Sequence, residues 1–157
     1  MLRRLLAEVQ ADRRALSARA AELDEFLRRW SGSDEGQAAA LALVLDRSYS
    51  GLEALIERVV RTLDGDVPRG ADWHRGLLDA ARLHVPTIRP AILAGSADAA
   101  DELRRFRHFV RHAYAAPLDP PRVRTLAAAW SAARPLLSAD LDAFEAFLEQ
   151  LATNLSV

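Results

Sequence analysis

Four arginines and two histidines lie within residues 104–114, RRFRHFVRHAY, of a 157-residue chain. Arginine is always charged, and its planar guanidinium suits the geometry of a phosphate group. Histidine has an ordinary pKa of about 6.5, so it gives or takes a proton near neutral pH. RNA supplies its own nucleophile, the 2′-hydroxyl, so a nuclease without a metal needs little more than a phosphate clamp and a proton-transfer group. Residues 104–114 therefore contain the side chains needed to cleave a phosphodiester.

The same stretch divides into two faces on a helical wheel. Its basic face carries no acid after Glu102, so we expect the positive charge to be uncompensated within the helix. A solvated surface paired with acids of a neighbouring helix fits this pattern, and so does a surface for RNA, a nucleotide or an acidic partner. The expected basic face is Arg104, Arg105, Arg107, His108, Arg111 and His112, and the expected core face is Leu103, Phe106, Phe109, Val110 and Ala113, with Tyr114 at its edge.

A metal site is a further interpretation of the two histidines. His108 and His112 are four residues apart, which is a ligand spacing on a helix. No third or fourth ligand is indicated nearby, and the surrounding arginines would repel a cation. We therefore expect neither a metal nor another cofactor.

Composition excludes several other kinds of chemistry. The chain has no cysteine, which excludes disulfides, thiolate metal sites and a cysteine nucleophile. All 21 basic residues are arginine and the formal net charge is −1, so any nucleic-acid binding must come from a local patch. We find no signal peptide and no apolar run of the ~18–20 residues needed to cross a bilayer. These features favour a cytoplasmic protein without a membrane partner.

The spacing of apolar residues predicts helices throughout. One amphipathic helix is expected from Leu2 to about Trp30, and a second, central one from about Glu35 to Leu63. Ser33 or Asp34 is available to cap the second helix, and Gly51 is a candidate kink within it.

Further helices follow toward the C-terminus. A third is expected after Asp72, a short or broken one over 86–96, and a fourth from a Ser96 cap to near Pro117. The last is expected over 121–152, with Asp119 as its cap, and Pro135 should kink or split it. Its second part would restart at Ser138 or Asp140. The sequence thus predicts an all-α antiparallel bundle of four to six helices, forming one domain over 1–157.

Three residues of the basic stretch form a more specific pattern. Arg107, His112 and Tyr114 give R-x4-H-x-Y in RHFVRHAY, which resembles the signature of HEPN-domain ribonucleases, in particular the HepT-type toxins of toxin–antitoxin pairs. Residues 48–81, SYSGLEALIERVVRTLDGDVPRGADWHRGLLDAA, and residues 111–126, RHAYAAPLDPPRVRTL, are similar to the segments that flank this motif. The resemblance extends over roughly 41–151.

The resemblance implies a metal-independent endoribonuclease that acts through attack of the 2′-hydroxyl. It implies that Arg107 holds the scissile phosphate and that His112 acts as general acid and base. Tyr114 corresponds to the tyrosine that a cognate nucleotidyltransferase antitoxin modifies with AMP. It further implies a dimer, or a larger homo-oligomer, in which two motifs face each other across a cleft. Supporting roles would belong to His108, Arg111 and Arg104.

Two questions stay open at the level of sequence. Five helical steps place Arg107 and His112 about 140° apart, so either the helix distorts or two copies share the site, and we favour the dimer. The basic face could also belong to a non-catalytic module that binds a nucleotidyltransferase or a nucleotide, or to a plain helical scaffold. Outside this stretch we expect Tyr49 in the core and His74 on the surface, without an assigned chemistry.

Overall fold

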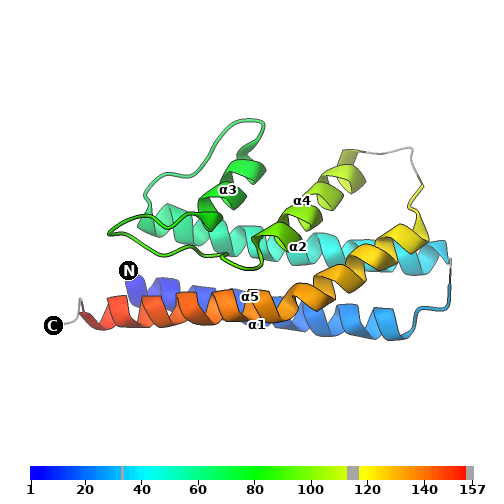
Figure 1. The fold of residues 1–157 in the computed structure, drawn as a ribbon, viewed down its shortest axis with the longest axis horizontal. Coiled ribbons are helices and arrows are strands. Elements are labelled where there is room, and N and C mark those ends of the chain that lie inside the picture. The colour runs from blue at the N-terminus through cyan, green and yellow to red at the C-terminus, as the bar shows by residue number, and fades with distance from the viewer. Residues whose placement is uncertain (33, 113–116, 155–157) are drawn as a thin grey trace.

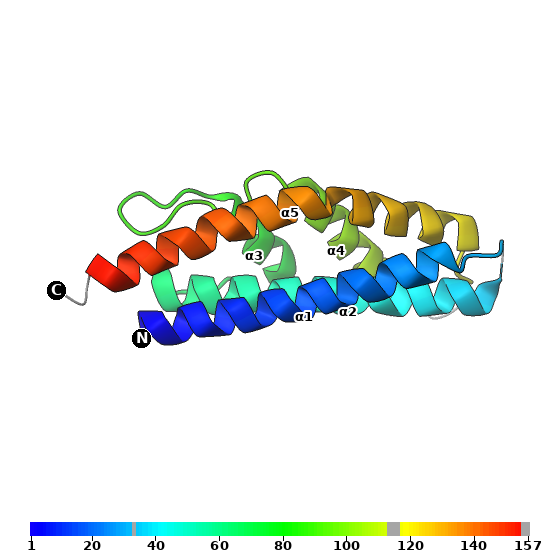
Figure 2. The same cartoon turned by 90° about the horizontal axis from the view of Figure 1, so that it is seen from below.

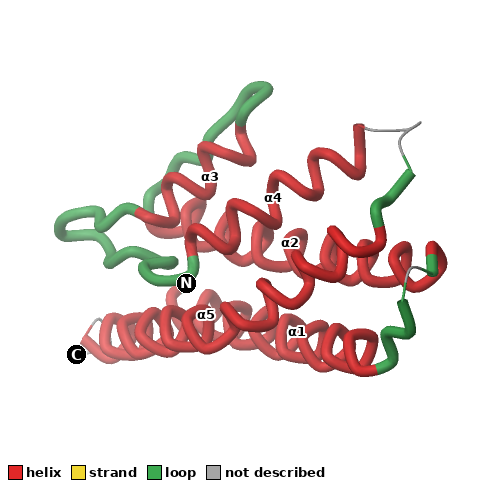
Figure 3. The backbone as a smooth tube through the Cα atoms, turned by 45° about the vertical axis from the view of Figure 1, so that its right-hand side comes forward, coloured by secondary structure: helices red, strands yellow, loops and turns green. Residues whose placement is uncertain are grey.

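The computed structural model describes residues 1–32, 34–112 and 117–154. This part of the chain contains helices and no strand, which confirms the all-α prediction. Figure 3 shows long non-helical segments on both sides of the short third helix. The helices are α1 (Leu2–Arg28), α2 (Glu35–Leu63), α3 (Trp73–Arg82), α4 (Ala97–His112) and α5 (Pro120–Asn154).

Three long helices run along the length of the molecule, and two short ones lie against one of them (Figures 1 and 2). The chain goes along α1, returns along α2 and finally along α5, so α1 is antiparallel to both. Helix α2 contacts each of the other four described helices, which confirms its predicted central position. The short helices α3 and α4 pack against α2 and against each other.

The core consists of the apolar stripes that the sequence predicts. Helix α2 buries residues on most of its circumference, because α1 and α5 cover one side of it and α3 and α4 another. It runs without a break through Gly51, where an added Cβ would lie 3.4 Å from Leu16 Cδ2 of α1. Gly51 therefore permits a close approach of two helices. At the start of α2, Asp34 Oδ1 accepts a hydrogen bond from Gly36 N at 2.7 Å, which confirms the predicted cap; Ser33 lies outside the described residues.

The predictions for the C-terminal half were partly wrong. Residues 86–96 form no helix: residues 86–88 make a turn closed by a bridge between Val85 and Arg89, and residues 90–96 are irregular. Helix α5 is continuous through Pro135, so the predicted split is wrong, but Figure 1 shows its axis changing direction near the middle, which fits the predicted kink. No helix restarts at Ser138 or Asp140. An interior proline removes one backbone hydrogen bond and crowds the preceding turn, which bends a helix, and the strong helix formers on both sides keep α5 continuous.

Two polar anchors fix the segment that leads into α4. The Arg89 side chain is fully buried and forms a two-pronged ion pair with Asp64, at 2.7 and 2.6 Å. Asp140 of α5 accepts hydrogen bonds from Gly95 N, from Ser96 N and from the Ser96 hydroxyl. The Ser96 hydroxyl therefore binds α5 instead of capping α4. Because α4 starts at the next residue, these anchors determine where its basic stretch lies.

Candidate functional site

Arg107 lies between α4 and a polar strip on α2. Its side chain is only 13% exposed, and its Nη1 donates to Glu53 Oε1 at 3.2 Å. Its Nε lies 3.2 Å from Asp46 Oδ1, and its guanidinium carbon is 5.5 Å from the centre of the Tyr49 ring. Asp46, Tyr49 and Glu53 are spaced three and four residues apart, so they share one face of α2.

The guanidinium of Arg107 is incompletely satisfied. Although Nε is close to Asp46, it is buried and forms no hydrogen bond of acceptable geometry. Buried donors in folded proteins nearly always have an acceptor, and arginine offers five N–H groups in a fixed fork. Because Nε is buried against Asp46, a further acceptor could reach Arg107 only through its Nη groups.

The expectation that the basic face is uncompensated within its helix was wrong for Arg104 and Arg105, whereas the alternative of pairing with acids of a neighbouring helix is confirmed for Arg107 and Arg111. Arg104 and Arg105 both pair with Asp101, which precedes them by three and four residues, at 2.8 and 2.6 Å. Arg111 pairs with Asp46 of α2 at 3.2 Å. Burial alone would raise the pKa of Asp101, but the hydrogen bonds and charges of Arg104 and Arg105 outweigh it and hold that pKa below its ordinary value. The acids precede the stretch or come from another helix, so the wheel did not place them on this face.

The predicted core face of α4 was also partly wrong. Leu103 is fully buried and Phe106 packs against the core, but Phe109 is 43% exposed. Near its C-terminal end, α4 diverges from α2, as Figure 1 shows. The guanidinium of Arg122 from α5 lies 6.0 Å from the centre of the Phe109 ring. Ala113 lies outside the described residues.

The two histidines of the stretch stack on the outer side of α4. Their ring centres are 4.1 Å apart with an interplanar angle of 28°. Nδ1 of His112 is 2.8 Å from the backbone oxygen of His108. A carbonyl only accepts, so Nδ1 carries the hydrogen and Nε2 is the nitrogen left for proton exchange. His112 is thus held in a form suited to act as a base.

A pocket of about 180 Å³ brings the predicted residues together. Arg107 and His112 both line it within one chain, so their angular separation on the wheel does not keep them apart. The ring of His112 folds back one turn toward His108. Tyr114 lies outside the described residues. The complete lining is Ala71, His74, Arg104, Arg107, His108, Arg111 and His112.

Sequence reasoning missed three residues of this site. His74, expected on the surface without a role, lines the pocket, and its Nδ1 lies 2.5 Å from Oε2 of the buried Glu53. Asp46 and Glu53 were not predicted as site residues, although acids at helical spacing on a mostly apolar helix can indicate a buried polar site. Tyr49 is buried as predicted. Burial, and then the neighbouring Glu53, raise the pKa of the Tyr49 phenol above its ordinary value.

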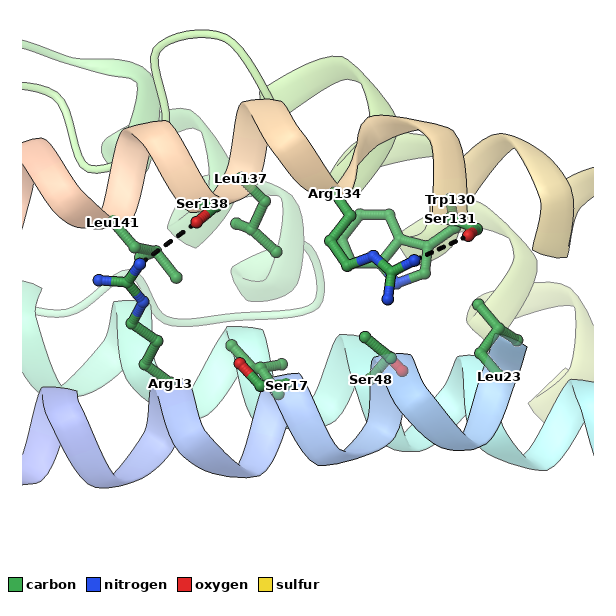
Figure 4. Close-up of a pocket in the computed structure, with 12 residues that line it drawn as sticks. Arg13, Ser17, Leu23, Ser48, Trp130, Ser131, Arg134, Leu137, Ser138 and Leu141 are labelled. Carbon is green, nitrogen blue, oxygen red and sulfur yellow. Dashed lines mark hydrogen bonds between the residues drawn. The ribbon is translucent and has the colours of Figure 1, made fainter. Parts of the chain in front are cut away.

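Another pocket, of about 150 Å³, opens between α1, α2 and α5 (Figure 4). Its walls are mostly apolar, and its arginines donate to nearby serines, Arg13 to Ser138 and Arg134 to Ser131. None of the described residues that line it is a histidine or an acid. Groups for proton transfer therefore gather at the α4 pocket and not here. Among residues 1–32, 34–112 and 117–154, no three His, Asp or Glu side chains are placed to hold a metal.

A comparison with protein families identifies the family of the chain. A family model described as HepT-like protein matches residues 40–148. The chain belongs to the HepT-like protein family. HepT-like proteins are broadly of the HEPN nuclease type, and the match includes every residue that lines the α4 pocket. No curated protein and no solved structure matches the chain. In the part of this HepT-like protein that the structure describes, no helix is long and apolar enough to span a membrane.

Proposed function

We propose that this HepT-like protein is a metal-independent endoribonuclease, the toxin of a toxin–antitoxin pair. The observation that carries the proposal is that Arg107 and His112, with its Nδ1 engaged, line one pocket. The family supports a nuclease-type fold, and the pocket adds a phosphate-binding group beside a proton-transfer group.

In the proposed reaction, Arg107 binds the scissile phosphate and stabilises the charge that develops on it. Arg104 and Arg111 add further donors, and His108 supports the ring of His112. Nε2 of His112 takes the proton of the 2′-hydroxyl, whose oxygen then attacks phosphorus. The P–O5′ bond breaks and the departing 5′-oxygen takes a proton, which leaves a 2′,3′-cyclic phosphate and a 5′-hydroxyl end. RNA supplies the nucleophile, so the step requires no metal.

The proposed regulation uses Tyr114, two residues after His112 in the sequence. A cognate nucleotidyltransferase antitoxin would attach AMP to this tyrosine. An adduct so close in sequence to the site brings bulk and negative charge, which compete with the phosphate of RNA for the same arginines. The active form is proposed to be a homodimer or a larger homo-oligomer.

A cleavage assay on mixed cellular RNA with excess EDTA tests the activity. Purified wild type, confirmed as unmodified by intact mass, is compared with Arg107→Ala and His112→Ala. We expect wild type to cleave and both variants to lose activity while retaining their circular dichroism spectra. His84→Ala is the matched control, because His84 is exposed and outside the pocket. Equal cleavage by all four proteins would show that the site is wrong.

The ion pairing of α4 favours a second candidate function. Each arginine of residues 104–111 already has a carboxylate partner, so this surface is less cationic than its sequence. The chain would then be a non-catalytic module that binds a nucleotidyltransferase or a nucleotide. Two results together would establish this candidate instead. Unmodified wild type would not cleave RNA, and it would capture the nucleotidyltransferase, whereas Arg111→Glu would not.

A further inference from the structure

Glu53 joins three helices at the α4 pocket. Its side chain, on α2, is 8% exposed. Oε2 lies 2.5 Å from Nδ1 of His74 on α3, and Oε1 accepts from Nη1 of Arg107 on α4 at 3.2 Å. A buried carboxylate is costly unless hydrogen-bond donors satisfy it, so this arrangement fixes both partners. Arg107, the proposed phosphate ligand, is thereby tied to a histidine outside the R-x4-H-x-Y pattern.

His74 is held in a defined orientation. A carboxylate only accepts, so Nδ1 of His74 carries the hydrogen and Nε2 is the nitrogen left to exchange a proton with a substrate. The ring also packs on Trp73, with ring centres 3.8 Å apart. The side chain is 35% exposed and lines the pocket, so solvent and substrate can reach it.

The pocket therefore contains two histidines with the same arrangement. Each engages an acceptor of the protein through Nδ1: Glu53 for His74, and the His108 carbonyl for His112. They come from different helices, α3 and α4. Transfer of phosphorus from the 5′-oxygen to the 2′-oxygen involves two protons, one leaving the 2′-hydroxyl and one arriving at the 5′-oxygen. A single histidine provides for one of them at a time.

We propose that His74 is the general acid of this site and that Glu53 positions it, an inference that rests on the proposed ribonuclease function. His112 removes the 2′-hydroxyl proton as the P–O2′ bond forms. The P–O5′ bond breaks, and the protonated Nε2 of His74 gives its proton to the departing 5′-oxygen. Both rings share the pocket with arginines, but only His74 contacts a carboxylate, which stabilises its positive imidazolium before transfer. Nδ1 of His112 has a neutral carbonyl as its acceptor, so His112 is better suited to be the base.

A pair of substrates with different leaving groups tests this assignment. One is a short RNA, whose 5′-alkoxide needs a proton to depart. The other is uridine 3′-(4-nitrophenyl phosphate), whose nitrophenolate departs without one. On RNA we expect His74→Ala to lose about 100- to 10,000-fold in rate, and on the nitrophenyl ester only a few-fold. His112→Ala should lose activity on both substrates, because both need the 2′-hydroxyl activated.

The controls separate a chemical role from a structural one. His74→Gln provides a second substitution of polar character, Glu53→Gln keeps the shape of the carboxylate without its charge, and His84→Ala replaces a histidine outside the pocket. We expect both His74 variants to show the split between substrates and His84→Ala to match wild type. Glu53→Gln should lose some activity on both substrates, because Glu53 also holds Arg107, and lose more on RNA.

Two results would overturn the assignment of His74 and leave the ribonuclease intact. One is cleavage of RNA by folded His74→Ala at the wild-type rate. The other is an equal loss on both substrates, which indicates a structural role or a base. Wild type that cleaves neither substrate, with intact mass showing no adduct, would overturn the proposed function itself.

Discussion

At the scale of single residues, the site depends on charges balanced across helices. Arg107 is nearly buried between Glu53 and Asp46, so removing it leaves two carboxylates short of a partner in a poorly solvated place. We expect Arg107→Ala to lower the free energy of unfolding by about 1–3 kcal/mol, measured by urea denaturation. Combining it with Glu53→Gln should recover part of this loss, because the stranded charge is gone.

Measurements of RNA cleavage separate the effect of Arg107 on stability from its effect on catalysis. The double variant should remain inactive on RNA although it is more stable than Arg107→Ala, because the phosphate ligand is still absent. If the double variant lost as much stability as the two single variants together, Arg107 and Glu53 would not interact energetically. Recovery of RNA cleavage together with stability would contradict the role of Arg107 as phosphate ligand.

Tyr49 gives the site a dependence on alkaline pH. Its pKa is raised because the phenol is buried beside Glu53, so the fold favours the neutral form. The stabilising contribution is complete below the pKa of the unfolded chain, about 10, and is lost as pH rises above it toward the folded value. We expect wild type to lose stability above that pH more steeply than Tyr49→Phe in urea denaturation at successive pH values. Parallel curves for the two proteins would contradict this environment.

Sequence patterns predict some residues of this site and not others. Arg107 and His112 follow from a local spacing, and that spacing is readable without a fold. Glu53 and His74 could not be assigned in the same way, because they lie on different helices and are 21 residues apart in sequence. Their pairing is a product of how α2, α3 and α4 pack, and single-helix wheels contain no information on it.

At the scale of elements, α4 depends on the segment before it. Arg89 is enclosed there, with Asp64 and three backbone carbonyls as its partners. We expect Arg89→Ala to cost about 3–5 kcal/mol in free energy of unfolding, because it strands a partly buried carboxylate and opens the turn. Arg69→Ala is the matched control, since the Arg69–Asp66 pair is almost fully exposed and should contribute nothing measurable. Similar urea midpoints for the two variants would show that Arg89 is not an anchor.

Helix α5 shows that local helix-breaking and capping signals do not by themselves determine where a helix ends. Pro135 suggests a boundary, and Asp140 a new cap, yet the helix runs on and Asp140 binds residues 95 and 96 instead. The prediction of a cap at Asp140 was therefore wrong, although its carboxylate does accept from backbone N–H groups. Its target was not predicted, because that target lies 44 or more residues away along the chain. Local chemistry predicts what a residue can do, and packing decides on which partner it acts.

At the scale of the whole molecule, the long helices form a frame and the short ones complete the site. Helix α1 lies outside the family match, yet it packs along both α2 and α5 and contributes buried leucines to the common core. Repeated apolar residues at three- and four-residue steps made this bundle predictable. The position of α3 was not, although α3 supplies His74.

The arrangement of the bundle also predicts how the activity is divided among copies of the chain. Arg107 and His112 line one pocket of one chain, so a single copy contains the groups that the wheel appeared to separate. Co-expressing Arg107→Ala and His112→Ala with two different affinity tags, and purifying through both tags in turn, gives assemblies in which no chain has a complete pocket. We expect such assemblies to cleave RNA no faster than either variant alone, whereas wild type carrying both tags remains active. Restored cleavage in the mixed assemblies would mean that Arg107 and His112 act on the same phosphate from different chains.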